Sequence, residues 1–190
     1  MVNSLPAAGL RAGFAILLTV AAASCDASST TVGSAENLWV QASKSSSEDS
    51  KLIAQMRNAT AKYHDIDVAR ADGYVDDGFG CVSDPVLGGM GWHLIRDDLH
   101  ADPAIDPLKP ELLIYEPQKH GGMKFVAVEY EVYQQDWKNA GNAQPPKLLG
   151  KEFEALTFEG IDPVYGLHVW LWADNKAGIL EDFNPKIKCP

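Results

Sequence analysis

Apolar and polar residues alternate most regularly over residues 165–174, with the sequence YGLHVWLWAD. Successive side chains of a β-strand point to opposite faces of its sheet, so this alternation predicts a strand. His168, Trp170 and Trp172 would lie on one face. The other face would carry a continuous apolar row of Tyr165, Leu167, Val169, Leu171 and Ala173. We therefore expect the apolar row to pack in the core and the face with His168 to line a pocket.

Three further segments have strand patterns. Residues 111–116 and 124–132 flank a turn-rich stretch and predict a β-hairpin. In the second of these strands Glu129 and Glu131 would lie on one face, and the opposite face would be an apolar row of Val126, Val128, Tyr130 and Val132. Residues 88–95 predict a strand in which glycines precede His93, and such glycines mark a bulge or a close approach of another segment. Residues 152–158 fit either a short strand or a helix.

A helical pattern precedes these strands. Apolar residues recur at helical spacing between residues 52 and 71. We expect a helix that begins after Ser47, with a break near His64 and Asp65 and an end at Gly73. Residues 76–81, 97–110 and 134–150 are rich in residues typical of turns and predict loops. The predicted fold class is α+β: an N-terminal helical segment packed on a curved, mainly antiparallel sheet or small barrel.

The N-terminal segment is different in kind. Residues 14–20 form an apolar run that is too short to span a membrane, and residues 21–24 are small. Together they resemble a bacterial secretory signal peptide. Cys25 follows directly and resembles the lipidated cysteine of a bacterial lipobox, although Ala22 stands where that motif usually has a larger aliphatic residue. The alternative is ordinary cleavage within residues 21–24, which would leave Cys25 as a free thiol.

This resemblance divides the chain into three parts. Residues 1–25 would be the signal peptide with its lipobox-like end, residues 26–50 a flexible Ser-rich tether, and residues 51–190 a single globular domain. Cys81 and Cys189 are the two remaining cysteines, and an even pair suits an oxidising compartment, so we expect them to form a disulfide. We expect an exported protein of the cell envelope, anchored as a lipoprotein, or secreted if Cys25 is not lipidated.

The charge balance restricts the partners. The formal net charge is −10, and every acidic residue follows Cys25. Repulsion between like charges argues against nucleic acid and anionic lipid surfaces as partners of the folded domain. We therefore expect contact with a membrane only through an N-terminal lipid, and a small molecule as the ligand.

Few polar residues interrupt the predicted strands, and these suggest a metal site. His93, Glu116, Glu129 and His168 would share the face opposite the apolar rows. Neutral imidazole and carboxylate groups bind Zn(II), Fe(II) or Mn(II), and this set would leave an open coordination position. His168 and Glu129 are the catalytic candidates, and Trp170 and Trp172 are the candidates for a substrate-binding wall. The sequence has no His-x-His or His-Glu-x-x-His motif, so it does not identify the metal.

Ordinary structural roles would explain the same residues. Glu129 and Glu131 could lie on the solvated face of an antiparallel sheet, and for Glu131 we expect that role. His168, Trp170 and Trp172 could be packed core residues. Three other histidines are weaker candidates: His64 on the helix surface, His100 among aspartates that could bind Ca²⁺, and His120 in an exposed turn.

Two hypotheses about function follow from these patterns. The first is a metal-dependent enzyme of the cell envelope that acts on a small molecule at the His93 and His168 face. The second is a non-catalytic ligand-binding or structural lipoprotein in which the same face is an aromatic cleft without metal. A distance of about 4–5 Å or less between the nitrogens of the two histidines favours the first, because both must lie about 2 Å from one ion.

Overall fold

The computed structural model describes residues 35–190, and the predicted signal peptide and Cys25 lie outside this range. Helix α1 (Ala35–Thr60) is followed by a short 3-10 helix η1 (Ala61–His64) and by α2 (Ile66–Ala71). Asp65 forms the predicted break, because its side chain accepts a hydrogen bond from Asp67 N and so caps α2. Gly73 adopts a φ of +96° and ends the segment as predicted.

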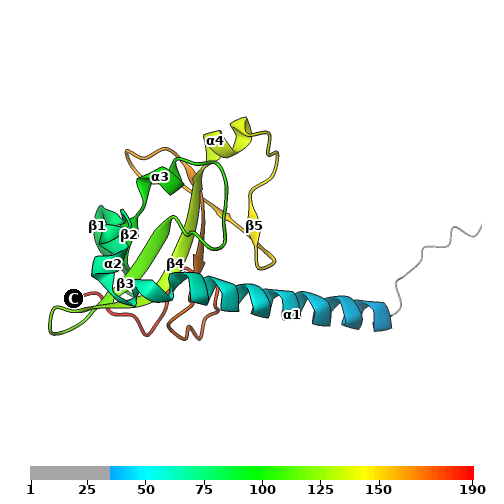
Figure 1. The fold of residues 1–190 in the computed structure, drawn as a ribbon, viewed down its shortest axis with the longest axis horizontal. Helices are drawn as coiled ribbons and strands as arrows, with labels where there is room; N and C mark the ends of the chain where they lie inside the picture. The colour runs from blue at the N-terminus through cyan, green and yellow to red at the C-terminus, as the bar shows by residue number, and fades with distance from the viewer. Residues whose placement is uncertain (1–34) are drawn as a thin grey trace, which may run out of the picture.

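The start of the first helix differs from the prediction. Helix α1 begins at Ala35 rather than after Ser47, so residues 35–50 of the predicted tether are helical. Its N-terminal part extends away from the rest of the domain (Figure 1). Among residues 35–190, no helix combines the length and the apolar character needed to cross a bilayer.

Six strands form one antiparallel sheet in the order β1-β2-β3-β4-β8-β7. The sheet curls into a half-barrel (Figure 1). These strands are β1 (Val75–Asp84), β2 (Gly88–Ile95), β3 (Leu112–Pro117), β4 (Met123–Tyr133), β7 (Glu154–Leu156) and β8 (Val164–Val169). Two very short strands, β5 (Lys147–Leu148) and β6 (Lys151–Glu152), pair separately. Short helices α3 (Asp97–His100) and α4 (Gln134–Asn139) lie in the connections. The predicted α+β class with a curved antiparallel sheet is confirmed.

Several predicted boundaries need correction. Residues 76–81, predicted as a loop, belong to edge strand β1, which pairs with β2 despite its glycines and aspartates. The strand predicted over residues 165–174 is shorter, because β8 ends at Val169. The register of β8 on β4 would place Leu171 beside Val126, but Trp172 N donates a hydrogen bond to Val126 O, so the chain is shifted by one residue beyond Val169.

Strand β4 contains a bulge that the alternation did not predict. Ile114 of β3 pairs with Ala127, whereas its neighbour Tyr115 pairs with Phe125, so Val126 is an extra residue. The bulge places Phe125 in the core under the helices and Val126 in a smaller cluster elsewhere, the reverse of the predicted faces. The alternation holds as predicted beyond the bulge.

The two sides of the sheet have different cores. The larger cluster lies between the helices and the sheet, and it includes Met56, Tyr63, Leu113, Val128, Tyr130, Val132 and Leu167. The smaller cluster comprises Leu112, Ile114, Val126, Ala127, Trp170 and Ile187. Most of the sheet face opposite the helices therefore remains available for other side chains.

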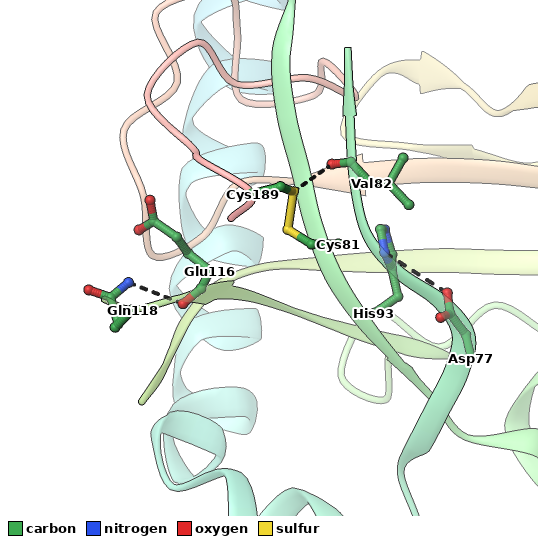
Figure 2. Close-up of a disulfide and its surroundings, with 7 residues drawn as sticks. All are labelled: Asp77, Cys81, Val82, His93, Glu116, Gln118 and Cys189. Atoms are coloured by element: carbon green, nitrogen blue, oxygen red, sulfur yellow. Dashed lines mark hydrogen bonds and ion pairs between the residues drawn. A yellow bond between two sulfur atoms is a disulfide. The ribbon is translucent and has the colours of Figure 1, made fainter. Parts of the chain in front are cut away.

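The C-terminal tail is fastened to β1. Cys81 and Cys189 form the predicted disulfide with a Cα–Cα distance of 5.5 Å (Figure 2). A cross-link between residues 108 positions apart stabilises the fold by about 4–5 kcal/mol in the chain-entropy model. The tail also explains one glycine of β2: a Cβ on Gly89 would lie 2.8 Å from Ile187 Cγ2, the kind of close approach that the glycine run predicted.

Candidate metal centre

Strands β2, β4 and β8 bring His93, Glu129 and His168 together. Glu129 of β4 pairs directly with His168 of β8. His93 of β2 pairs with Ile114 of β3, which pairs with Ala127, two residues before Glu129 on the same face of β4. The period of two and the antiparallel register thus place all three side chains on the face opposite the helices.

The three side chains lie close together and are buried. His168 Nδ1 is 3.3 Å from Glu129 Oε1, and His93 Nε2 is 3.6 Å from Glu129 Oε2. One ligand atom from each residue lies within 4.8 Å of the others, which agrees with the separation expected for a shared ion. His168 is 0 % exposed, and His93 and Glu129 are each 4 % exposed.

Several polar atoms of this group lack hydrogen-bond partners. Among the described residues, nothing hydrogen-bonds His93 Nδ1 or either ring nitrogen of His168. His168 Nδ1 lies at ion-pair distance from Glu129, but the atoms are not aligned as a hydrogen bond. Because buried polar atoms are nearly always paired in folded proteins, such orphaned nitrogens require an explanation. A metal ion is one, since it would occupy imidazole lone pairs and a carboxylate oxygen at once.

Burial and mutual attraction set the protonation of the group. Burial lowers the pKa of His93 to about 4, so its imidazole is neutral and carries a free lone pair at pH 7. Burial opposes the charges of Glu129 and His168, but their attraction outweighs it, so the pKa of Glu129 lies below its usual value and that of His168 above. A metal ion would therefore displace a proton from His168, which makes its binding dependent on pH.

Asp77 approaches the other side of His93. Its Oδ2 lies 4.0 Å from His93 Nδ1 (Figure 2). Burial raises the pKa of Asp77 to about 6. A carboxylate beside the outer nitrogen of a ligating histidine commonly orients its ring, so Asp77 of β1 would direct His93 Nε2 toward Glu129.

A cavity of about 730 Å³ opens beside the group. His93 and Glu129 line it, whereas His168 lies behind them and is fully buried. The rim carries two exposed aromatic side chains, Phe79 and Phe158, whose ring centroids are 6.1 Å apart. An ion held by the three residues would therefore face a pocket large enough for a small molecule.

The structure does not bring Glu116 to this group. Glu129 pairs with Leu112, so Glu116 lies four residues further along β3, roughly 13 Å at the rise of a strand. It instead pairs with Lys124, with 3.8 Å between Lys124 Nζ and Glu116 Oε2. Its carboxylate points away from His93 (Figure 2).

Neither Trp170 nor Trp172, the predicted substrate-binding residues, lines the 730 Å³ cavity. Trp170 is 2 % exposed, stacks beside His168 at 5.9 Å between ring centroids, and donates its indole hydrogen to Glu181 O. Trp172 lies toward the helices, with its ring 4.4 Å from that of His64. The predicted tryptophan wall is therefore replaced by apolar side chains, including Phe79 and Phe158.

Sequence reasoning undervalued Glu131 and His100. Glu131 is 9 % exposed rather than solvated, and its Oε2 lies 3.2 Å from His100 Nε2. Burial first, and then the charge of Glu129, raises the pKa of Glu131 to about 7. The sequence signal that could have identified Glu131 was its two-residue spacing from Glu129, because residues two apart on a strand share a face. His100 lies in α3 with its ring 4.4 Å from that of Tyr133, and no calcium-type cluster forms around it among the described residues.

Comparison of the chain with protein-family models, with curated proteins and with solved structures finds no match. The argument about function therefore depends on the geometry of the site alone.

Proposed function

We propose that this protein is a metal-dependent enzyme that acts on a small molecule, with His93, Glu129 and His168 as ligands of one Zn(II), Fe(II) or Mn(II) ion. One observation carries the proposal: three buried donor groups from three strands converge, with orphaned nitrogens, beside a 730 Å³ cavity. In a cluster that only stabilises the fold, the buried nitrogens would be expected to have hydrogen-bond partners.

The donor set suits catalysis better than structural metal binding. Two imidazoles and one carboxylate occur in catalytic zinc sites and in non-haem iron sites, where three protein ligands leave a position for water or substrate. A bound ion would supply Lewis acidity and would lower the pKa of a bound water. Structural zinc sites, by contrast, are usually closed by four protein ligands.

The surrounding residues have separate roles in this proposal. Glu129 balances part of the positive charge, and Asp77 orients His93 from behind. Glu131 lines the cavity, and its pKa of about 7 suits a group that accepts and returns a proton near neutral pH. His168 then serves as a ligand rather than as a free base, because it does not line the cavity.

We propose in addition that the protein works outside the cytoplasm, as a lipoprotein anchored through Cys25. The support is the signal-like N-terminal sequence, together with the Cys81–Cys189 disulfide, which is consistent with an oxidising compartment. Labelling with a lipid precursor, in wild type and in Cys25→Ser, tests this part independently of the metal.

The test of the metal site is elemental analysis of protein purified without an affinity tag. We expect one transition-metal ion per chain in wild type and in the control His120→Ala, which removes a turn histidine. We expect the ion to be lost from His93→Ala, His168→Ala and Glu129→Gln. Near-ultraviolet circular dichroism shows whether each variant remains folded, and Glu129→Gln keeps the shape of the side chain.

The outcomes separate the two functional hypotheses. Metal in wild type that disappears from the three folded variants supports the enzyme. Wild type that binds none of the three metals at neutral pH contradicts it and leaves the non-catalytic ligand-binding lipoprotein as the better hypothesis.

A further inference from the structure

We infer that the cavity takes a small organic ammonium compound, with a positively charged amine on an apolar or aromatic body. This inference names the substrate class of the proposed enzyme and rests on that proposal for its reaction. The preference for positive charge comes from residues outside the metal group, so it can be measured separately.

The lining of the cavity is strongly acidic. It contains six carboxylates, Asp76, Asp77, Asp97, Glu129, Glu131 and Asp162, and no lysine or arginine among the described residues. Asp76 accepts a hydrogen bond from the Trp92 indole, and Glu129 belongs to the metal group. The other four have no lysine or arginine partner within residues 46–190. Such a lining attracts cations and repels anions.

A buried nitrogen without a hydrogen-bond partner provides a second, independent observation. His100 lines the cavity and is 7 % exposed, and its Nε2 has no hydrogen-bond partner among the described residues. It lies 3.2 Å from Glu131 Oε2 without hydrogen-bond alignment. The carboxylate oxygen of Glu131 is an acceptor, and so is His100 Nε2 in the tautomer that carries its hydrogen on Nδ1. A primary ammonium has three N–H donors and can satisfy both acceptors at once.

The outer part of the cavity suits an apolar body. Phe79 is 56 % exposed and Phe158 is 43 % exposed, and their rings face the rim 6.1 Å apart. Leu156 and Ile161 add to the apolar lining. Aromatic rings bind flat or aliphatic groups, and their faces also attract cations. A ligand with its charge near Glu131 and its apolar part between the phenylalanines would complement both ends.

A second metal ion is the competing explanation for the carboxylates. Within the described residues, however, His93, Glu129 and His168 are the one group of three donors close enough to share an ion. His100 and Glu131 supply two donors at most. An organic cation, which needs hydrogen-bond acceptors rather than a full coordination shell, fits this end of the cavity better.

The test compares ligands that share one frame: 4-phenylbutylamine, 4-phenylbutanol and 4-phenylbutyrate. Their affinities are measured by calorimetry with metal-free and metal-loaded wild type. We expect the amine to bind at least about tenfold more tightly than the alcohol, and the carboxylate to bind most weakly to the metal-free protein. The trimethylammonium analogue of the amine cannot coordinate a metal, so its binding excludes coordination as the cause of the preference.

Variants locate the preference. Glu131→Gln should reduce the advantage of the amine over the alcohol, and so should the double variant Asp97→Asn/Asp162→Asn, which changes only exposed residues at the mouth. Glu48→Gln removes an exposed charge from α1, outside the cavity, and should leave the advantage unchanged. If Glu131→Gln fails to fold, the double variant still tests the inference.

Equal affinities for amine and alcohol, tighter binding of the carboxylate by metal-free protein, or no binding of the amine would overturn the inference. These results are distinct from a failure of the proposed function. If the proposed metal site is wrong, elemental analysis finds no metal in wild type. If the amine preference is wrong, calorimetry with metal-free protein shows it.

Discussion

The central strands β2, β3, β4 and β8 have two buried faces, which differ in what satisfies their polar atoms. Leu167 is 1 % exposed and its neighbour His168 is 0 % exposed, so burial does not distinguish the two sides. On the side with the helices, the Tyr130 hydroxyl donates to Pro107 O at 2.7 Å and the Tyr115 hydroxyl donates to Tyr63 O at 2.8 Å. On the opposite side His93 and His168 retain nitrogens without hydrogen-bond partners among the described residues.

This difference in hydrogen bonding distinguishes side chains that only stabilise the fold from side chains that are candidates to bind a ligand. A side chain that completes its hydrogen bonds within the protein stabilises the fold and needs no ligand. A buried group that leaves donors or acceptors unpaired destabilises the fold unless something else binds there. The helix-covered face is therefore a core. In the proposed function the opposite face is a binding site, and ligand binding offsets the destabilising effect of its unpaired groups.

The largest predicted effect is a contrast between two adjacent residues. Leu167→Ala should lower the free energy of unfolding by about 2–5 kcal/mol, because it leaves a cavity in the core beneath the helices. It should leave one metal ion per folded chain. His168→Ala should remove the metal while it leaves the apolar row of β8 intact. Urea unfolding and elemental analysis of both variants measure the two effects.

The contrast fails if the two variants behave alike. If His168→Ala destabilises the metal-free protein as much as Leu167→Ala does, then His168 is a packing residue and the two faces are one core. If Leu167→Ala loses metal while still folded, the site depends on the packing beneath β8 more than its local geometry suggests.

Alternation along single strands predicted much of the site. The period of two is a local property, so it correctly placed Glu129 and His168 opposite their apolar rows without knowledge of the sheet. The same rule placed His93 on a shared face after the glycine run. The disulfide was also predictable, because two cysteines in an expected exported domain allow one pairing.

The failures come from features that depend on distant segments. Glu116 follows the same alternation, but the register of β3 against β4 places it four residues from the position opposite Glu129. Trp172 left the predicted face because its backbone bonds to the bulged Val126 of another strand. Glu131 is buried because α3 and residues 156–164 surround the cavity. Register, bulges and cover are non-local, so one sequence does not determine them.

The second prediction concerns pH and the charged face. The pKa of Glu131 is raised from 4.5 to about 7 by burial and by the charge of Glu129. Its contribution to stability is therefore fully present below about pH 4.5 and is lost as the pH rises through 7, because the folded state holds the proton more tightly. Glu131→Gln should remove this loss, on the order of 3 kcal/mol at most, from metal-free protein.

The comparison with the variant isolates Glu131 from its neighbours. The pKa of His93 is lowered to about 4, so its pH dependence is opposite to that of Glu131. His93 destabilises the fold as the pH falls from 6.5 to 4. Wild type shows the sum, so the measured quantity is the difference between wild type and Glu131→Gln in unfolding free energy from pH 4.5 to 8. Glu48→Gln is the control. A constant difference across this range would mean that Glu131 does not titrate there.

The smallest predicted effect is at Gly166, which makes room for the acidic side chains. A Cβ on this residue would lie 2.7 Å from Leu156 Cδ1, 3.4 Å from Glu129 Oε1 and 3.7 Å from Glu131 Oε1. Leu156 is partly exposed at its end of the short strand β7, so it can move aside. Its displacement and the crowding of Glu129 should cost about 1 kcal/mol of stability, partly offset by the lower entropy of the unfolded chain.

Gly166→Ala should affect the site more than the fold. We expect the protein to keep its ion but to bind it about tenfold more weakly, the lower end of the effects seen when groups around metal ligands are disturbed. Gly122→Ala is the matched control, because its nearest neighbour would be Gln118 Cβ at 3.9 Å. Metal titration and urea unfolding measure both variants. If Gly166→Ala matches Gly122→Ala in both measurements, the carboxylates have spare space, and packing does not hold Glu129 in place.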